Sequence, residues 1–130
     1  MISEKNTTTA LRLLQAIGEH DTPTVRSLVT HEATWWVLGF GSPEQASDRG
    51  PFVDWLPDIL SRTFAGPLKF QILGVTSQGD RVAVEARSEG RLTNGKAYAN
   101  QYHFLFTFAG DKVNAVREYN DTAYMREQLA

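Results

Sequence analysis

The segment from residue 81 to residue 121 constrains the fold more than any other part of the chain. It contains three runs that alternate apolar and polar residues, and two tight turns, at residues 93–96 and 109–112, separate them. The first turn carries the pair Asn94-Gly95, which strongly favours a β-hairpin. An apolar run before this segment ends at a further turn, residues 77–80. The pattern therefore predicts a meander of four antiparallel strands, at residues 68–76, 81–93, 96–108 and 113–121.

The first half of the chain reads mainly as helix. Apolar residues at helical spacing predict a helix at residues 7–19, and Thr22-Pro23 predicts the start of a second one that ends near residue 30. A short apolar run at residues 33–40 predicts a buried strand. A third helix is predicted at residues 51–64, where Pro57 should kink it or split it in two. A short helix at residues 122–129 closes the chain. Helices grouped before a curved sheet predict an α+β fold with the helices on one face of the sheet, and a ligand cavity between the two layers.

Composition narrows the class of protein. The 130 residues fit a single domain, residues 1–130, and the net charge of −2, with both signs interspersed, gives no indication of nucleic-acid binding. The absence of cysteine excludes disulfides and thiolate chemistry and suits a cytoplasmic protein. The N-terminal residues lack the apolar core of a signal peptide, and no apolar run approaches the length of a membrane span. We therefore expect a cytoplasmic protein that binds neither nucleic acid nor membrane.

Three charged residues in the middle of predicted strands are the candidates for catalysis. Arg87 and Glu89 share one strand face because side chains alternate with period two, and Glu118 lies on the last strand. If that face is concave, the arginine would hold one carboxylate ionised, and the second carboxylate could act as an acid or base. The alternation also supports the opposite interpretation, in which the face of Val82 and Val84 is buried and the charges face solvent. Both interpretations stand at this point.

Aromatic residues supply the candidates for substrate binding. We expect an apolar pocket near the first strand and the third helix, formed by Trp36, Phe40, Phe52, Trp55 and Leu56. Tyr102 belongs to an aromatic strand face that runs from residue 98 to residue 108, and that face needs a cover. A homodimer is therefore expected. The three histidines show no spacing typical of a metal site, and neither a phosphate-binding loop nor a nucleophile elbow is present, so no metal or cofactor is expected.

The order of elements, with the motifs Gly-Arg-Leu-Thr-Asn-Gly-Lys-Ala-Tyr (residues 90–98) and Val-Arg-Glu-Tyr-Asn-Asp (residues 116–121), resembles the nuclear transport factor 2-like superfamily. It resembles in particular the SnoaL-like branch, with its polyketide cyclases, ketosteroid isomerase relatives and limonene-epoxide hydrolases. The resemblance covers nearly the whole chain. It implies a cone-shaped, curved, mixed or antiparallel sheet wrapped over N-terminal helices, the cystatin-like arrangement. This scaffold hosts enzymes and non-enzymes alike.

Some residues that the family uses for catalysis have a counterpart in this chain, and others do not. The epoxide hydrolases use Arg-x-Asp on one strand and a carboxylate on the final strand, which Arg87-Ser88-Glu89 and Glu118 match with Glu in place of Asp. Their water-holding Tyr and Asn on the first long strand are replaced here by Trp36-Val37-Leu38. The base of ketosteroid isomerase lies where this chain has Val37-Leu38-Gly39, so that mechanism is disfavoured. Polyketide cyclases use an acid-base carboxylate on the last strand, to which Glu118 or Asp121 could correspond.

Two functions follow as hypotheses. The first is a small-molecule enzyme that holds an apolar substrate in the cone and carries out cofactor-free acid-base chemistry of the isomerase, cyclase or hydrolase type. Glu118 would be the acid or base, with Arg87 orienting it and Glu89 as the second carboxylate, and Asn120, on the same face as Glu118, would bind a substrate oxygen. His103 and Asp121 stay open as further site residues. The alternative is a non-catalytic module of the same fold that binds a small ligand or dimerises.

Overall fold

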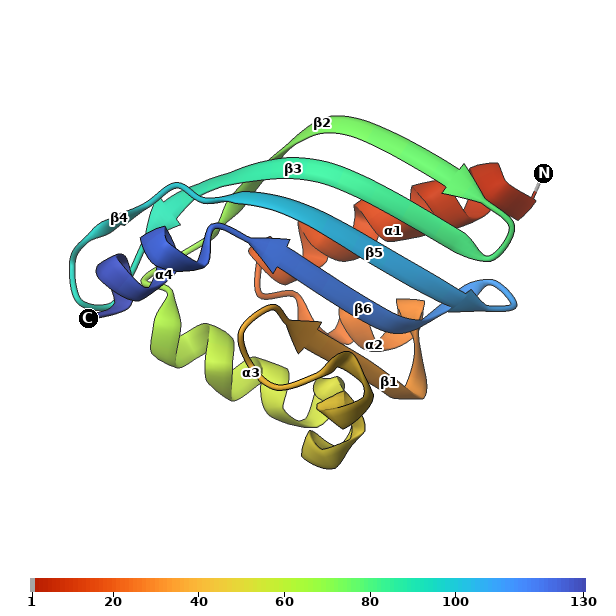
Figure 1. Ribbon diagram of the computed structural model, residues 1–130, viewed down its shortest axis with the longest axis horizontal. Helices are drawn as coiled ribbons and strands as arrows, with labels where there is room; N and C mark the ends of the chain where they lie inside the picture. Colours follow the sequence, from red (N-terminus) through yellow and green to blue (C-terminus); the bar gives the residue numbers. More distant parts are fainter. Residues whose placement is uncertain (1) are drawn as a thin grey trace.

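The computed structural model describes residues 2–130, with side chains from residue 4 onward (Figure 1). The chain begins with the helices α1 (Ile2–Gly18) and α2 (Thr22–Leu28), which are followed by the strand β1 (Val29–Val37), the short 3₁₀ helix η1 (Pro43–Arg49) and the helix α3 (Phe52–Thr63). The strands β2 (Lys69–Gln78), β3 (Arg81–Arg91), β4 (Ala97–Tyr98), β5 (Gln101–Ala109) and β6 (Lys112–Asn120) follow, and α4 (Thr122–Leu129) ends the chain. The predicted α+β class is confirmed.

The sheet is mixed, because β1 runs parallel to β6 whereas the other neighbours are antiparallel. Its order is β1-β6-β5-β3-β2, with β4 paired to β3. The predicted antiparallel meander is confirmed, but the predicted strand at residues 96–108 is interrupted. Asn100 causes the interruption: its backbone N–H donates to the Ser88 hydroxyl and its side-chain oxygen accepts from the Gln101 N–H, so this residue leaves the regular pairing pattern. The Asn94-Gly95 turn consequently joins β3 to the short β4.

Pro57 lies inside the third helix, and Asp121 stands at the start of the last one. Pro57 does not split the third helix in two, since α3 is one helix with Pro57 inside it. A proline has no N–H for the carbonyl four residues earlier, here that of Val53. The Arg26 guanidinium of α2 donates to this carbonyl at 3.2 Å and so supplies the missing partner. The last helix has the predicted limits, and the Asp121 carboxylate caps it by accepting from the Tyr124 N–H.

One face of the curved sheet is buried against the helices. On β3 the side chains of Val82, Val84 and Ala86 are buried, whereas Arg87 and Glu89 are exposed. The aromatic face of β5 is also buried within the single chain, where it forms part of the main hydrophobic core with α1 and α3. The argument that a second subunit must cover this face is therefore wrong, because the helices of the same chain cover it.

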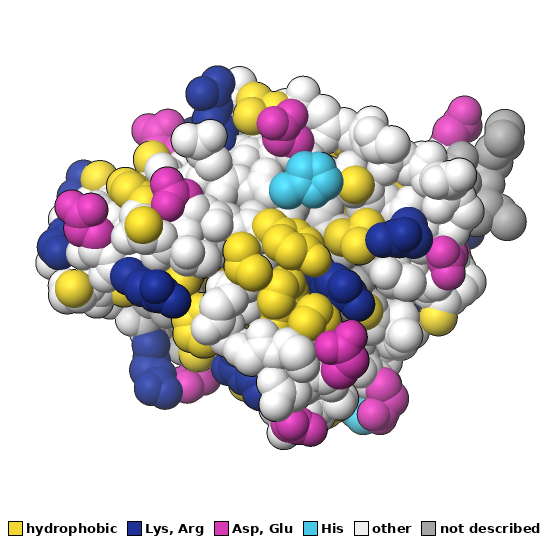
Figure 2. Space-filling model, in the orientation of Figure 1, with side chains coloured by type: hydrophobic (Ala, Val, Ile, Leu, Met, Phe, Trp, Pro, Cys, Tyr) yellow, Lys and Arg dark blue, Asp and Glu magenta, His cyan; other side chains and the backbone are white. Residues whose placement is uncertain are grey.

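The outer face of the sheet carries both charged and apolar side chains. Figure 2 shows a cluster of hydrophobic side chains near the middle of one face of the molecule, with charged side chains around it. The edge strand β2 exposes Ile72, Leu73 and Val75. Among residues 2–130, no helix is long and apolar enough to cross a membrane.

Candidate functional site

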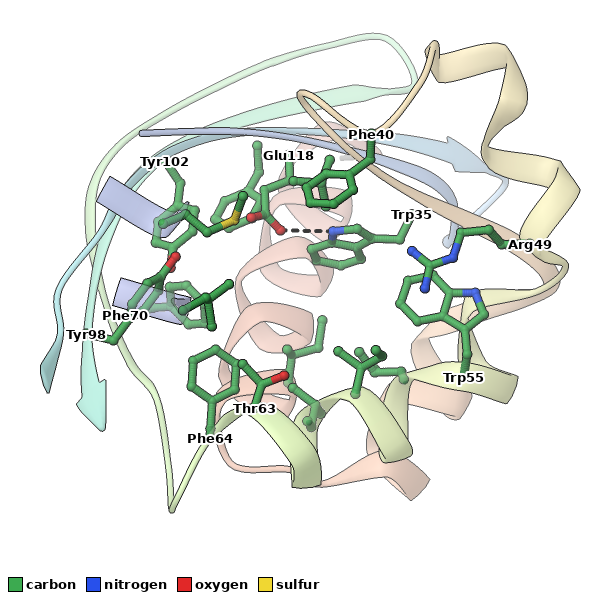
Figure 3. Close-up of a pocket in the computed structure, with 18 residues that line it drawn as sticks. Trp35, Phe40, Arg49, Trp55, Thr63, Phe64, Phe70, Tyr98, Tyr102 and Glu118 are labelled. Carbon is green, nitrogen blue, oxygen red and sulfur yellow. Dashed lines mark hydrogen bonds between the residues drawn. The ribbon is translucent and has the colours of Figure 1, made fainter. Parts of the chain in front are cut away.

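A cavity of about 350 Å³ lies between the sheet and the helices (Figure 3). Its wall is mainly aromatic and aliphatic, and its polar groups are few: Arg49, Thr63, Tyr98, Tyr102 and Glu118. The apolar side chains that complete the wall are Ile17, Trp35, Val37, Phe40, Trp55, Leu56, Ile59, Leu60, Phe64, Phe70, Phe104, Met125 and Leu129. An apolar pocket with a small number of converging polar groups is typical of a small-molecule site.

Glu118 is the single carboxylate in the cavity wall, and two donors hold it. The Trp35 indole N–H donates to Oε1 at 3.0 Å, and the Asn120 side-chain N–H donates to Oε2 at 2.7 Å (Figure 3). The register of the sheet aligns Glu118 with Phe104, and Phe104 with Val84, so these three side chains form one row across the inner face. The geometry fixes both carboxylate oxygens and leaves their remaining lone pairs for a ligand.

The environment of Glu118 makes its carboxylate a stronger base than usual. Removal of the carboxyl group from water raises its pKa above the ordinary value of 4.5, and the hydrogen bonds from Asn120 and Trp35 lower it by less. No cation forms an ion pair with Glu118 among the residues that the structure describes. A carboxyl group with a raised pKa in an apolar pocket is suited to accept and return a proton.

The side-chain amide of Asn120 can hydrogen-bond to Glu118 whether the carboxyl group is ionised or protonated. Its side-chain oxygen Oδ1 is buried and has no hydrogen-bond partner among the described residues, while its Nδ2 donates to Glu118. A half-turn of the amide would present Oδ1 as an acceptor for a protonated carboxyl group. Asn120 therefore offers a hydrogen bond to either form of the acid.

Two tyrosine hydroxyl groups form a second polar region of the cavity. The Tyr98 hydroxyl accepts from the Asn100 side-chain N–H at 2.8 Å, and the Tyr102 hydroxyl lies 2.7 Å from the Ser88 hydroxyl. Asn100 is buried and joins the two tyrosines, because its backbone N–H also donates to Ser88. The interruption between β4 and β5 thus holds this network in place.

Both tyrosines stay protonated at neutral pH. Burial raises the pKa of Tyr98 to about 12, and burial followed by the charge of Glu118 raises the pKa of Tyr102 still further. Since the Tyr98 oxygen already accepts from Asn100, its own O–H remains to donate. This region can therefore supply a hydrogen bond to a ligand oxygen.

The structure does not bring Arg87 and Glu89 to Glu118. Both side chains are exposed on the outer face, and the Arg87 guanidinium donates to Gln71 on β2 at 2.8 Å. The physical reason is the parity of β3: Ala86 and Ser88, on either side of Arg87, are buried, so the alternating chain must place Arg87 and Glu89 outside. The expected convergence of the three charged residues was wrong. Asn120 does lie beside Glu118, as the sequence predicted.

Some of the aromatic and apolar residues predicted to bind substrate line the cavity, and others do not. Phe40, Trp55, Leu56 and Tyr102 line the cavity, and Phe40 is 61% exposed. Phe52 is fully buried between the rings of Trp35 and Trp55 and does not line the cavity.

Trp36 points the other way. Its ring packs edge-on against Tyr119, and its N–H donates to the Gly41 carbonyl. The neighbouring Trp35, which the sequence reasoning missed, reaches Glu118 instead. The requirement of a buried indole N–H for an acceptor was the signal that could have pointed to this pair.

The remaining polar candidates lie outside the cavity wall. His103 is exposed on the outer face of β5, and Asp121 caps α4. No group of three or more potential metal ligands occurs among residues 2–130.

The comparisons with known proteins agree with this geometry. The SnoaL-like domain family matches residues 10–116, which is most of the chain. The chain belongs to the SnoaL-like domain family. No curated protein is significantly similar to the sequence. The resemblance expected from the motifs of β3–β4 and β6 is thereby confirmed.

Solved structures extend the likeness of this SnoaL-like chain at low sequence identity. A proposed SnoaL-like polyketide cyclase from Jannaschia sp. CCS1 is 19% identical with a TM-score of 0.80, over 98% of this chain and 93% of that one. Bal32a, from a soil-derived mobile gene cassette, is 23% identical with a TM-score of 0.80, and each chain is covered in full (100%). An LEH-like epoxide hydrolase of Mycobacterium tuberculosis is 16% identical with a TM-score of 0.77, over 98% and 90% of the chains. At these identities the likeness shows the nuclear transport factor 2-like fold.

Proposed function

We propose that this SnoaL-like protein is a small-molecule enzyme in which Glu118 transfers a proton to and from an apolar substrate without a cofactor. The observation that carries the proposal is the position of a single carboxylate, with raised pKa, in the wall of an open apolar cavity. Its two oxygens are oriented by Trp35 and Asn120, so the base is held ready for a substrate.

The chemistry that suits this arrangement is proton transfer at a carbon next to a carbonyl group. Glu118 takes the proton, and the electron pair of the broken C–H bond moves onto the carbonyl oxygen. The Tyr98 hydroxyl is the donor we assign to that oxygen, because its pKa of about 12 keeps it protonated. Return of the proton at another carbon completes an isomerisation. Attack of the carbanion on a second carbonyl of the same substrate completes a cyclisation, and Glu118 then gives the proton to the new alkoxide.

A deuterium-exchange assay tests this proposal without knowledge of the natural substrate. The probe is 2-tetralone, a flat apolar ketone with exchangeable C–H bonds, in D₂O, followed by proton NMR. The wild type should accelerate exchange. Glu118→Gln should lower the protein-dependent rate by about 100-fold or more, as expected for loss of a general base. Glu85→Gln, which removes an exposed carboxylate of β3, is the matched control and should leave the rate unchanged.

Glu118→Gln is expected to fold, which keeps the test informative. Glutamine has the same shape, and its oxygen can still accept from the Trp35 N–H. The unpartnered Oδ1 of Asn120 can accept from the new amide after a half-turn. A folded Glu118→Gln protein that exchanges at the wild-type rate would remove Glu118 from the mechanism. Binding of the ketone with no exchange above background would instead favour the alternative function, a module that binds its ligand passively, which the largely apolar wall also suits.

A further inference from the structure

One end of the cavity contains an arginine held against a tryptophan ring. The guanidinium carbon of Arg49, the last residue of η1, lies 3.9 Å from the centroid of the Trp55 ring on α3, and both residues line the cavity. Figure 3 shows this pair at one side of the cavity, Tyr98 and Tyr102 at the other, and Glu118 between them. This cation–π contact holds the guanidinium over the ring face and uses none of its N–H groups as hydrogen-bond donors.

The donors at this end have no acceptor from the described part of the chain. Arg49 makes no ion pair and no hydrogen bond there, although Asp48 and Asp54 are close in sequence. The Trp55 indole N–H is buried and also lacks a partner among residues 2–130. Arg62, on the same helix as Trp55, differs from Arg49: it forms an ion pair with Asp58 at 3.0 Å, and it does not line the cavity. An arginine held at a cavity wall without a protein acceptor is suited to an anionic ligand group.

We propose that Arg49 binds a carboxylate of the substrate, so that the substrate class is an apolar carbon skeleton with a carboxylate at one end and a carbonyl group towards the other. This inference rests on the proposed function, because it takes the same cavity as the substrate site. Glu118 is itself an anion when it acts as a base, so a substrate carboxylate beside it would be repelled. The positions of Arg49 and Glu118 in Figure 3 keep the two negative charges apart. A planar carboxylate matches the two parallel N–H bonds that a guanidinium offers.

Isothermal titration calorimetry with two matched probes tests the inference. The probes are 2-naphthoate and methyl 2-naphthoate, which share a flat apolar skeleton and differ in charge. We expect wild-type protein to bind the anion more tightly than the ester. Arg49→Gln should weaken binding of 2-naphthoate by about tenfold or more, since it removes a hydrogen bond between two charged groups. The same substitution should change the affinity for the ester by less than about twofold.

Two further variants separate specific recognition from general charge effects. Arg49→Lys keeps the charge but loses the planar fork, and it should restore only part of the affinity for 2-naphthoate. Arg62→Gln removes the same charge from an exposed ion pair outside the cavity and should change neither affinity. Circular dichroism of each variant checks that it is folded, and an exposed side chain such as Arg49 is expected to be dispensable for folding.

The outcomes distinguish the inference from the proposed function. If the anion and the ester bind wild-type protein with equal affinity, or if Arg49→Gln leaves 2-naphthoate binding unchanged, the carboxylate site is refuted while the cavity remains a ligand site. If neither probe binds wild-type protein, the cavity does not take flat apolar ligands. That result would count against both the inference and the proposed function.

Discussion

Burial of Glu118 should leave a measurable mark on the pH dependence of stability. The pKa of this carboxyl group is raised in the folded protein, so the folded state holds the proton more tightly than the unfolded chain does. Below the unfolded pKa both states are protonated and Glu118 adds no penalty. As the pH rises from the unfolded pKa to the folded pKa, the free energy of unfolding of the wild type should fall, and above the folded pKa this loss should be complete.

The size of this loss follows from the two pKa values. For each pH unit by which the folded pKa exceeds the unfolded one, wild-type protein loses about 1.4 kcal/mol relative to a variant that cannot ionise at this position. Glu118→Gln is that variant, because it keeps the shape of the side chain. The difference in the free energy of unfolding between the two proteins should therefore change with pH and become constant at high pH. The variant should be relatively more stable there than at low pH.

Urea denaturation of both proteins at 25 °C, from pH 4 to pH 9, measures this difference. Glu127→Gln, at an exposed position of α4, serves as the control and should show a difference that hardly varies over the same range. NMR titration of Glu118 gives the folded pKa independently, and 1.4 kcal/mol times the measured pKa difference should equal the change in stability. A stability difference that does not vary with pH, or one that favours the wild type as pH rises, would refute the burial argument.

Three further predictions concern stability and assembly. Asn100→Ala removes the side-chain hydrogen bonds that organise the tyrosine region and should cost about 2–4 kcal/mol in urea denaturation, whereas Asn114→Ala, at an exposed strand position, should cost less than about 0.5 kcal/mol. Gly18→Ala would drive its Cβ into the backbone carbonyl oxygen of Leu68 and should lower the thermal midpoint strongly. Gly74→Ala, whose Cβ would have no neighbour closer than 3.8 Å, should be tolerated far better. We also expect a homodimer, now because of the exposed apolar residues of β2, and sedimentation showing only monomer at micromolar concentration would contradict it.

The sequence predicted the architecture well because the local patterns were strong. The turn residues, the alternation in β3, β5 and β6, and the short helix α4 each depend on a few neighbouring residues. The parallel pairing of β1 with β6 brings distant segments together and was not predicted. The continuity of α3 also depended on a distant residue, because the donor that satisfies the Val53 carbonyl is Arg26 of another helix.

The site was harder to predict than the fold because it depends on which sheet face is buried. Alternation alone showed that Arg87 and Glu89 share a face, but the choice between the two faces came from the packing of Val82 and Val84 against the helices. The same limit applied to the first strand. Trp35 and Trp36 are neighbouring residues of the same type, so they point to opposite faces of the sheet. The position of β1 beside β6 decides that Trp35, and not Trp36, contacts Glu118.

The position of α4 has a practical consequence for work on the purified protein. Met125 and Leu129 of this helix line the cavity, and the helix is fastened to the β3–β4 turn by exposed hydrogen bonds, in which the Lys96 ammonium donates to the carbonyls of Glu127 and Ala130. In Figure 1 the C-terminus lies at this end of the molecule and the N-terminus at the opposite end. An affinity tag fused after Ala130 would compete with these bonds and crowd the cavity. A tag placed before the first helix would leave this end of the molecule unchanged.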